Sequence, residues 1–280
     1  MSNFPNSFSI PLDKWIDGIM EWLLINLEVF FDFIGFVILN VIVTFENLFL
    51  FIPWFIFIPL VGFLGWKFVG KKSIAITFML MLLLIGSFGY WELSMKTLSL
   101  VITSVFFSLL IGIPHGVLMA RSDKLESIMK PILDGMQTMP SFVYLIPALM
   151  FFGMGKVPAM FATIIYAIPP VIRLTNIGIR TVDKEVIEAA LAYGASSKQV
   201  LFDVQIPLAK PSIMVGINQT TMMALSMVVI GSMIGAKGLG MEVLLAINRI
   251  EVGKGFEAGI SIVILAIIID RITFSFSKKR

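Results

Sequence analysis

Long uninterrupted apolar stretches constrain this chain more than any other feature of its sequence. A helix needs about 20 consecutive apolar residues to cross the roughly 30 Å hydrocarbon core of a bilayer. Of the 280 residues, 58% are hydrophobic and 14% are charged. Soluble domains have about 45–50% apolar and about 25% charged residues. The chain is therefore predicted to be an all-α polytopic membrane protein with about seven transmembrane helices.

The predicted crossings begin only after residue 46. They cover Asn47–Trp66, Ser73–Trp91, Thr97–Met119, Gly135–Gly153, Val157–Asn176, Pro211–Met233 and Phe256–Thr273. Prolines inside them are compatible with membrane helices, because neighbouring helices satisfy the backbone groups that a proline frees. We expect three parts, which are residues 1–46 ahead of the spans, a peripheral helix pair over 47–93, and a core domain over 94–280.

Lysine and arginine residues favour one orientation of these crossings. If the C-terminus lies in the cytoplasm, 15 of the 21 Lys and Arg residues fall on cytoplasmic segments. Cytoplasmic loops of membrane proteins carry such an excess of positive charge. An odd number of crossings then places the N-terminus outside. We predict a multi-pass protein of the cell membrane with an outer N-terminus and a cytoplasmic C-terminus.

The first 46 residues carry an acidic stripe, formed by Asp13, Asp17, Glu21, Glu28 and Asp32. Their four- and seven-residue steps place them on one face of a helix. An ionised side chain at the bilayer centre costs about 2.5–3.5 kcal/mol even on the insertion scale. A helix in the membrane interface keeps such a stripe in water and buries its apolar side. We expect an extracytoplasmic tail followed by an interfacial amphipathic helix within residues 14–46, with an eighth crossing as the alternative.

A polar segment between the fifth and sixth predicted crossings, the 177–210 loop, is long for this chain and lies on the cytoplasmic side. Loops of this size inside compact proteins usually serve a function. Apolar residues recur at three- and four-residue steps from Val186 to Tyr193, which predicts a short helix lying across the cytoplasmic face.

The same loop contains start and stop signals for helices. Either Thr181 or Asp183 is suited to cap the start of the predicted helix. Gly194 offers a break after which a second short helix turns away. Pro207 and Pro211 are expected to end the loop and to begin the next span.

Within this loop, Glu188-Ala189-Ala190, then Gly194 after three residues and Val204-Gln205-Ile206-Pro207 after nine more, resemble the Glu-Ala-Ala loop of binding-protein-dependent ABC importer permeases. The family pattern ends in Ile-x-Leu-Pro, so the spacing matches in full with two conservative replacements. The resemblance implies a type I ABC importer permease fold in which the loop forms a coupling helix on a separate ATPase. It assigns ATPase coupling to Glu188, Ala189, Ala190, Gly194, Ile206 and Pro207.

Other segments are similar to one subfamily, the glycine betaine/proline betaine (osmoprotectant) permeases of the Gram-positive type. They are Thr138–Pro147, Gly153–Gly155, Tyr166–Arg173 and Gly235–Gly240. The likeness extends from about Ser94 to Ile272. It implies transport of glycine betaine or a related quaternary amine. The alternatives are an ABC importer permease for another small solute, such as an amino acid, and a stand-alone secondary transporter.

The resemblance also implies partners. They are a second permease copy in a homodimer, two cytoplasmic ATPases that bind ATP and Mg, an extracytoplasmic solute-binding protein and membrane lipid. The chain has no cysteine and one histidine, and it shows neither a Walker-type phosphate loop nor a nucleophile–base set. We therefore expect no catalytic residue, metal or cofactor on this chain. Its net charge of +3 gives no indication of a nucleic-acid partner.

Prolines and polar residues inside the spans are candidates for the transport pathway or its gate. Prolines kink helices beside a pathway or shape packing, and both interpretations stay open here. Polar side chains in a span face either other helices or a water-filled path. The candidates are Pro140, Pro147, Pro169, Asn218, Gln219, Thr221 and Ser226.

Overall fold

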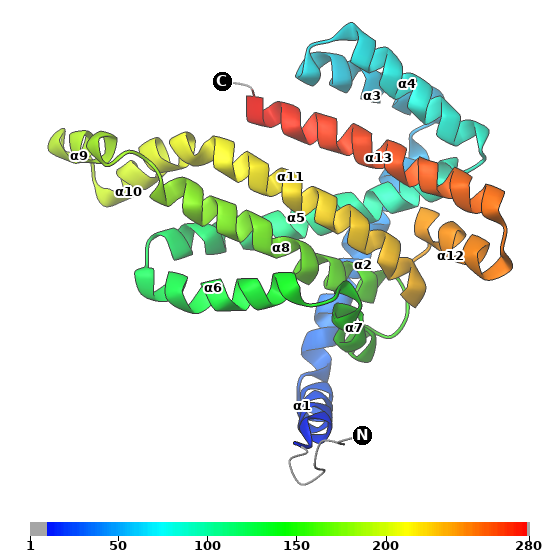
Figure 1. Cartoon of the computed structure of the whole chain (residues 1–280), viewed down its shortest axis with the longest axis horizontal. Coiled ribbons are helices and arrows are strands. Elements are labelled where there is room, and N and C mark those ends of the chain that lie inside the picture. Colours follow the sequence, from blue (N-terminus) through cyan, green and yellow to red (C-terminus); the bar gives the residue numbers. More distant parts are fainter. Residues whose placement is uncertain (1–9, 279–280) are drawn as a thin grey trace, which may run out of the picture.

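The computed structural model describes residues 10–278, with side chains described up to residue 275. Every regular element in that part of the chain is a helix (Figure 1), so the predicted all-α fold is confirmed. Five helices are long and apolar enough to cross a membrane. They are α2 (Glu28–Phe51), α5 (Trp91–Ala120), α8 (Lys156–Arg180), α13 (Val252–Lys278) and the helix over Ser197–Ile234, which joins α10 (Ser197–Gln199), η3 (Val200–Gln205), α11 (Ile206–Gly231) and η4 (Ser232–Ile234).

Helices α5, α8 and α11 form the centre of the bundle, and α13 lies beside α11 (Figure 1). Glycines let α5 and α8 approach closely. A Cβ atom at Gly112 would lie 2.4 Å from Cγ1 of Val171, and one at Gly116 would lie 2.7 Å from the backbone oxygen of Ile172. Helix association in lipid depends on such small-residue contacts, because lipid tails are as apolar as leucine. The α5–α8 pair therefore packs too closely at these glycines to leave room for a side chain.

The predicted crossing over Gly135–Gly153 is wrong as a single straight helix. The segment bends by 107° between two arms. Met139 is extended (ψ 134°), because the ring of the following residue, Pro140, excludes the helical conformation at the residue before it. The two arms comprise α6 (Asp123–Thr138), the 3-10 turn η2 (Ser141–Tyr144) and α7 (Leu145–Phe152).

The predicted number of about seven crossings is not confirmed. Two of the seven correspond to α3 (Trp54–Val69) and α4 (Lys72–Ser87), which have 16 residues each. Such helices are about 24 Å long at 1.5 Å per residue, shorter than the roughly 30 Å hydrocarbon core. The first begins after Pro53 rather than at Asn47, because residues 47–51 complete α2. The described chain holds five long apolar helices, or six if the bent α6–α7 pair counts as one.

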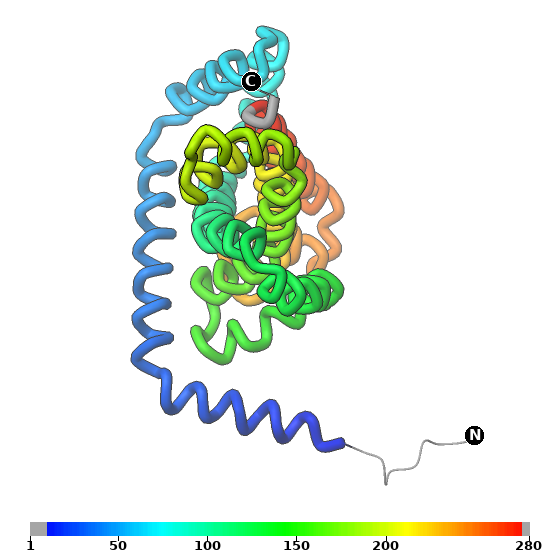
Figure 2. The backbone as a smooth tube through the Cα atoms, turned by 90° about the vertical axis from the view of Figure 1, so that its left-hand side faces the viewer, coloured from blue at the N-terminus to red at the C-terminus, as the bar shows by residue number. Residues whose placement is uncertain are grey.

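The helix expected within residues 14–46 is not continuous, and its placement in the membrane interface stays a prediction. The segment divides at Leu27 (φ −119°) into α1 (Leu12–Asn26) and α2. Helix α1 has no buried residue, whereas α2 is apolar and long enough to cross a membrane. Figure 1 and Figure 2 show that α2 runs across the axis of the α5–α8–α11 bundle instead of along it, and that α1 turns away from its lower end. The predicted tail over residues 1–9 lies outside the described residues.

Contacts along its length fix α2 on the bundle. Ile38 and Ile42 are buried in a core cluster with residues of α5 and α8. The ring of Phe31 stacks on that of Phe151 with 4.0 Å between the centroids. Glu46, which is buried, forms an ion pair with Lys156 at the start of α8. The crosswise helix is therefore attached to the bundle by both apolar and ionic contacts.

The two ends of the bundle carry different short helices (Figure 1). At one end α12 (Leu239–Arg249) starts with a buried cap, in which the hydroxyl of Thr97 accepts a hydrogen bond from the backbone N–H of Leu239 across 2.9 Å. At the other end α9 (Lys184–Ala192) and α10 project beyond the long helices. The projecting end contains the 177–210 loop.

Candidate functional site

The first half of the 177–210 loop folds into the short helix that its periodicity predicts. Helix α9 begins after Asp183, and the Oδ1 atom of this residue accepts a hydrogen bond from the backbone N–H of Glu185 across 2.9 Å. Of the two predicted caps, Asp183 is therefore the one that the structure uses. The hydroxyl of Thr181 instead bonds back to a carbonyl of α8.

The predicted break at Gly194 is confirmed. Its φ angle is +86°, a conformation that residues with a side chain rarely adopt. No atom lies within 4 Å of the place that a Cβ atom would occupy, so the requirement for glycine is one of backbone conformation alone. The following helix, α10, starts with a capping box between Ser196 and Gln199.

Helix α9 presents its side chains to the outside of the molecule. None of its residues is buried, and Glu188 and Ala189 are exposed, while Ala190 is half-buried. Leu191 is exposed as well, and Tyr193, just after the helix, is 94% exposed. A short helix that offers a carboxylate, small residues and apolar side chains together is suited to bind another protein.

The base of the loop is packed between the ends of α8 and α11. A cluster of buried side chains joins the two helices and the start of the loop's second half. Gly178 reinforces this contact, because a Cβ atom there would lie 2.7 Å from Cβ of Ser212. Both ends of the loop are therefore anchored, whereas α9 between them has no buried residue. The buried cluster consists of Ile179, Leu201, Ala209 and Ile213.

Pro207 lies in the first turn of α11, as predicted, whereas Pro211 lies inside that helix. The helix is continuous from Ser197, so the connection is shorter than the 177–210 loop suggested. A π-helical turn, η3, precedes Pro207, and the backbone N–H of Ile206 bonds to the carbonyl of Leu201 five residues earlier. Wider turns of this kind occur where the regular helical hydrogen bonds are interrupted. Pro207 itself is exposed and directly follows this turn, where a residue without a backbone N–H fits the interrupted hydrogen-bond pattern.

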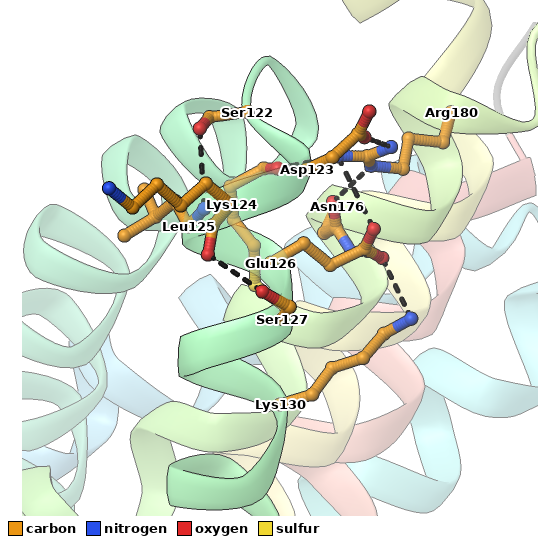
Figure 3. A network of polar contacts seen from close by, with 10 residues as sticks. Ser122, Asp123, Lys124, Leu125, Glu126, Ser127, Lys130, Asn176 and Arg180 are labelled. Carbon is orange, nitrogen blue, oxygen red and sulfur yellow. Dashed lines mark hydrogen bonds and ion pairs between the residues drawn. The ribbon is translucent and has the colours of Figure 1, made fainter.

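Arg180, the last residue of α8, is the centre of a polar network beside the loop (Figure 3). Its guanidinium donates to Oδ1 of Asp123 at 2.6 Å and to Oδ1 of Asn176 at 3.1 Å. It also donates to the backbone oxygen of Met119 at 3.0 Å and lies 3.3 Å from Oε2 of Glu126. The network joins the end of α8 to the end of α5 and to the first turn of α6.

Glu126 is the second node of this network. Its Oε1 atom accepts hydrogen bonds from the amide of Asn176 and from the ammonium of Lys130, both at 2.9 Å. Both hydrogen bonds stabilise the ionised carboxylate, and the bond from Asn176 has the larger effect. They hold the pKa of the Glu126 carboxyl below its ordinary value. The carboxylate lies in the first turn of α6, outside the five long apolar helices.

Sequence reasoning counted Arg180 only as a positive charge and missed its partners. A usable signal was present. Arg173 and Arg180 are seven residues apart and share one face of α8, and the neighbouring amphipathic helix α6 carries carboxylates. The second arginine contact confirms this arrangement, because Arg173 binds Oδ1 of Asp134 at 2.5 Å.

The three candidate pathway prolines lie in three different elements. Pro140 is exposed at the bend after α6, and Pro147 is half-buried in the first turn of α7. Pro169 is buried inside α8. The first of them accounts for the bend, whereas a role of any of them in a pathway stays a prediction.

The four polar candidates on α11 face different surroundings. The amide of Asn218 donates to Oδ1 of Asp270 on α13 at 3.0 Å, so interhelical bonding is the interpretation that fits this residue. Thr221 is buried and lines a cavity of about 270 Å³ between α5, α11 and α13. Gln219 and Ser226 are exposed on the opposite side of the helix. These two are the candidates that remain available to a pathway.

Comparison with known proteins identifies relatives of the whole chain. Residues 112–280 match the family described as "Binding-protein-dependent transport system inner membrane component". The chain is 50% identical over 279 residues to the glycine betaine/carnitine transport permease protein GbuB of Listeria monocytogenes, covering 98% of each chain. It is 44% identical to the glycine betaine transport system permease protein OpuAB of Bacillus subtilis, covering 97% of this chain and 96% of the relative.

Further similarities agree with these two. The glycine betaine/proline betaine transport system permease protein ProW of Escherichia coli is 44% identical over 94% of this chain and 74% of its own length. Among solved structures, the inward-facing MetNI methionine ABC transporter matches with a TM-score of 0.58 and 24% identity, over 66% of this chain and 93% of that chain. The structural match supports the type I permease fold alone.

Proposed function

Since this chain belongs to the family of binding-protein-dependent transport system inner membrane components, we propose that it is the permease subunit of an ATP-binding-cassette importer for glycine betaine or a related quaternary amine. The observation that carries this proposal is the 50% identity to a glycine betaine/carnitine permease over 98% of both chains. The exposed helix α9, anchored at both ends, provides the surface that such a subunit needs for its ATPase.

Glycine betaine is the solute that the names of three relatives share, while carnitine and proline betaine each occur in one. It is therefore the substrate that we propose. The alternative of an amino-acid importer is supported only by a fold-level match to a methionine transporter. The alternative of a stand-alone secondary transporter has no support among the relatives, which are permease subunits by name.

In this proposal α9 is the coupling helix. Glu188 makes polar contacts in a groove of the ATPase, and Ala189 and Ala190 allow close approach. Gly194 directs the chain back towards the membrane, and Ile206 and Pro207 form the start of α11. Exposure of α9 and burial of the loop's base support these roles, because movement of α9 reaches α8 and α11 directly.

The proposed assembly contains two copies of this chain, two cytoplasmic ATPases that bind ATP and Mg, and an extracytoplasmic binding protein. The α9 end is then the cytoplasmic end, with the N-terminus outside and the C-terminus inside. Positive charge supports this orientation. The α9 end of the bundle carries more of the Lys and Arg residues than the opposite end does. They include Arg121, Lys124, Lys130, Arg173, Arg180, Lys184, Lys198 and Lys210.

The proposed pathway runs along the exposed face of α11 that holds Gln219 and Ser226. These hydroxyl and amide groups are costly against lipid and are suited to a solvated path. Pairing of two permease copies along this face would remove both residues from lipid. Aromatic recognition of the quaternary ammonium is assigned to the separate binding protein.

The test is reconstitution of the complete importer in liposomes, with ATP inside and glycine betaine plus binding protein outside. We expect uptake that needs ATP, the ATPase and the binding protein together. Competition with unlabelled carnitine, proline betaine, choline and methionine ranks these compounds by how strongly each reduces the uptake of labelled glycine betaine. Uptake driven by an ion gradient in liposomes that contain this chain alone would overturn the proposal.

A double variant tests the coupling surface. Glu188→Lys with Gly194→Asp is expected to abolish uptake and to leave membrane insertion normal. Lys184→Gln, which changes an exposed charge of the same helix outside the motif, serves as the matched control. Wild-type uptake by the double variant contradicts the assignment of α9.

A further inference from the structure

We propose that Arg180 is a positioning residue, which ties the end of α8 beside the coupling helix α9 to α6 and α5. Through it, α5, α6 and α8 follow the movement of α9 as one unit. This inference rests on the proposed function and adds to it a residue outside the Glu-Ala-Ala pattern. It is carried by the network of Figure 3 and by the place of this network in the chain.

The position of Arg180 is the first argument. It is the last residue of α8 and stands three residues before Asp183, the residue that caps α9. Any displacement of α9 by an ATPase therefore passes through the short joint between these two residues. A side chain at this point decides which parts of the membrane domain move with α9.

The partners of Arg180 are the second argument. They belong to three elements, with Met119 in α5, Asp123 and Glu126 in α6, and Asn176 in α8 itself. A guanidinium is planar and presents five donors in a fixed fork, which suits simultaneous bonds to several acceptors. A lysine offers a point charge without this fork. Arginine is therefore the residue that joins all three elements at once.

Burial of the network is the third argument. Asn176 is only 1% exposed, and the side chain of Glu126 is 17% exposed. An isolated surface ion pair contributes little to stability, because water and salt screen it. Here the amide of Asn176 lies between the arginine and the carboxylate and bonds to both. The contact is a connected and partly dry network rather than a surface pair.

The chain supplies a matched control on the same two helices. Arg173 also joins α8 to α6, through Asp134 at 2.5 Å, and its side-chain exposure of 33% resembles the 29% of Arg180. It lies two helical turns farther from the loop. Loss of Arg173 weakens the α6–α8 contact without touching the joint to α9.

The first experiment measures ATP hydrolysed per glycine betaine imported by the reconstituted importer, for wild type, Arg180→Gln, Arg180→Lys and Arg173→Gln. We expect about a tenfold rise in this ratio for Arg180→Gln, the size of one lost charge-assisted hydrogen bond. Arg180→Lys is expected to raise this ratio less than Arg180→Gln does, and Arg173→Gln is expected to keep the wild-type ratio. Equal ratios for Arg180→Gln and Arg173→Gln overturn the proposal.

The second experiment does not depend on transport. The sequence contains no cysteine, so a single cysteine at Lys184 accepts a spin label in the full chain without interference. We expect Arg180→Gln to increase the mobility of this label and Arg173→Gln to leave it unchanged. If the wild-type importer takes up no glycine betaine, the proposed function fails while this readout still decides the role of Arg180. Unchanged mobility in Arg180→Gln overturns that role.

A milder variant covers the case in which Arg180→Gln does not fold. Asp123 is 91% exposed on its side chain and contributes one acceptor at 2.6 Å. Asp123→Asn is therefore expected to fold and to shift both readouts in the same direction by a smaller amount. No shift of either readout in a folded Asp123→Asn protein contradicts the proposal.

Discussion

The amide nitrogen of Asn218 on α11 donates a hydrogen bond to Oδ1 of Asp270 on α13 across 3.0 Å. Both side chains are half-buried, and the amide oxygen of Asn218 is buried without a hydrogen-bond partner. The bond connects the helix that continues the 177–210 loop to the last helix of the chain. Its removal therefore weakens the contact between α11 and α13, at the helix into which the 177–210 loop continues.

Asp270→Leu is expected to lower the thermal stability of the detergent-purified protein. Interhelical hydrogen bonds in membranes contribute about 0.6 kcal/mol on average and about 1.7 kcal/mol at most. Asp270→Asn keeps an acceptor at the same place and is expected to retain most of the stability. Thermal unfolding followed by tryptophan fluorescence measures both. Equal unfolding midpoints for the leucine variant and the wild type contradict the prediction.

Gly116→Ala is expected to disrupt the contact between α5 and α8. The new methyl group would lie 2.7 Å from the backbone oxygen of Ile172, an atom that cannot move aside without moving α8. Overpacking of this kind costs about 1–3 kcal/mol. Gly135→Ala in α6 is the control, because no atom lies within 4 Å of its Cβ position. We expect a lower unfolding midpoint for the first variant only.

Substitutions of Gly194 are expected to follow backbone preference and not side-chain size. The φ angle of +86° costs a residue with a Cβ atom about 1–2 kcal/mol, and asparagine tolerates it better than other residues. Gly194→Asn should therefore keep more uptake than the smaller Gly194→Ala, and Gly194→Val should keep least. ATP-dependent uptake at matched protein levels gives this order. A ranking by volume would show that a steric contact matters instead.

Lys156→Met is expected to destabilise the protein strongly, because it leaves Glu46 charged and buried against α8. Breaking a buried pair from one side costs about 3–5 kcal/mol, whereas replacing both partners by apolar residues is often neutral. The double variant Glu46→Met, Lys156→Met should therefore recover most of the unfolding midpoint. Lys254→Met removes an exposed pair with Glu251 and should change the midpoint little.

The long central spans were predictable from sequence because hydrophobic length alone determines them. The predicted crossing Thr97–Met119 lies wholly inside α5, and Val157–Asn176 lies inside α8. Hydropathy alone locates these two helices, so their positions in the sequence could be predicted without knowing which of their residues are buried. The Gly194 break was also predictable, and the cap of α9 was narrowed to Thr181 or Asp183, since each signal depends on one residue and its immediate neighbours.

Features set by tertiary contacts were not predictable in the same way. No proline or glycine marks the division at Leu27, so the acidic periodicity before and after it suggested one helix. Pro140 signalled a kink, but its position in the sequence does not specify the 107° angle of the bend. The partners of Arg180 in α5 and α6 lie 54 to 61 residues away, and only the folded chain brings them together.

The continuous helix over Ser197–Ile234 determines how far a small movement at the cytoplasmic end is carried. Its 38 residues extend about 57 Å at 1.5 Å per residue. A tilt of about 5° about one end displaces the other end by roughly 5 Å at that length. In the proposed function this helix therefore enlarges displacement: a shallow rocking of the ATPase against α9 would move the far end of the helix by several ångströms.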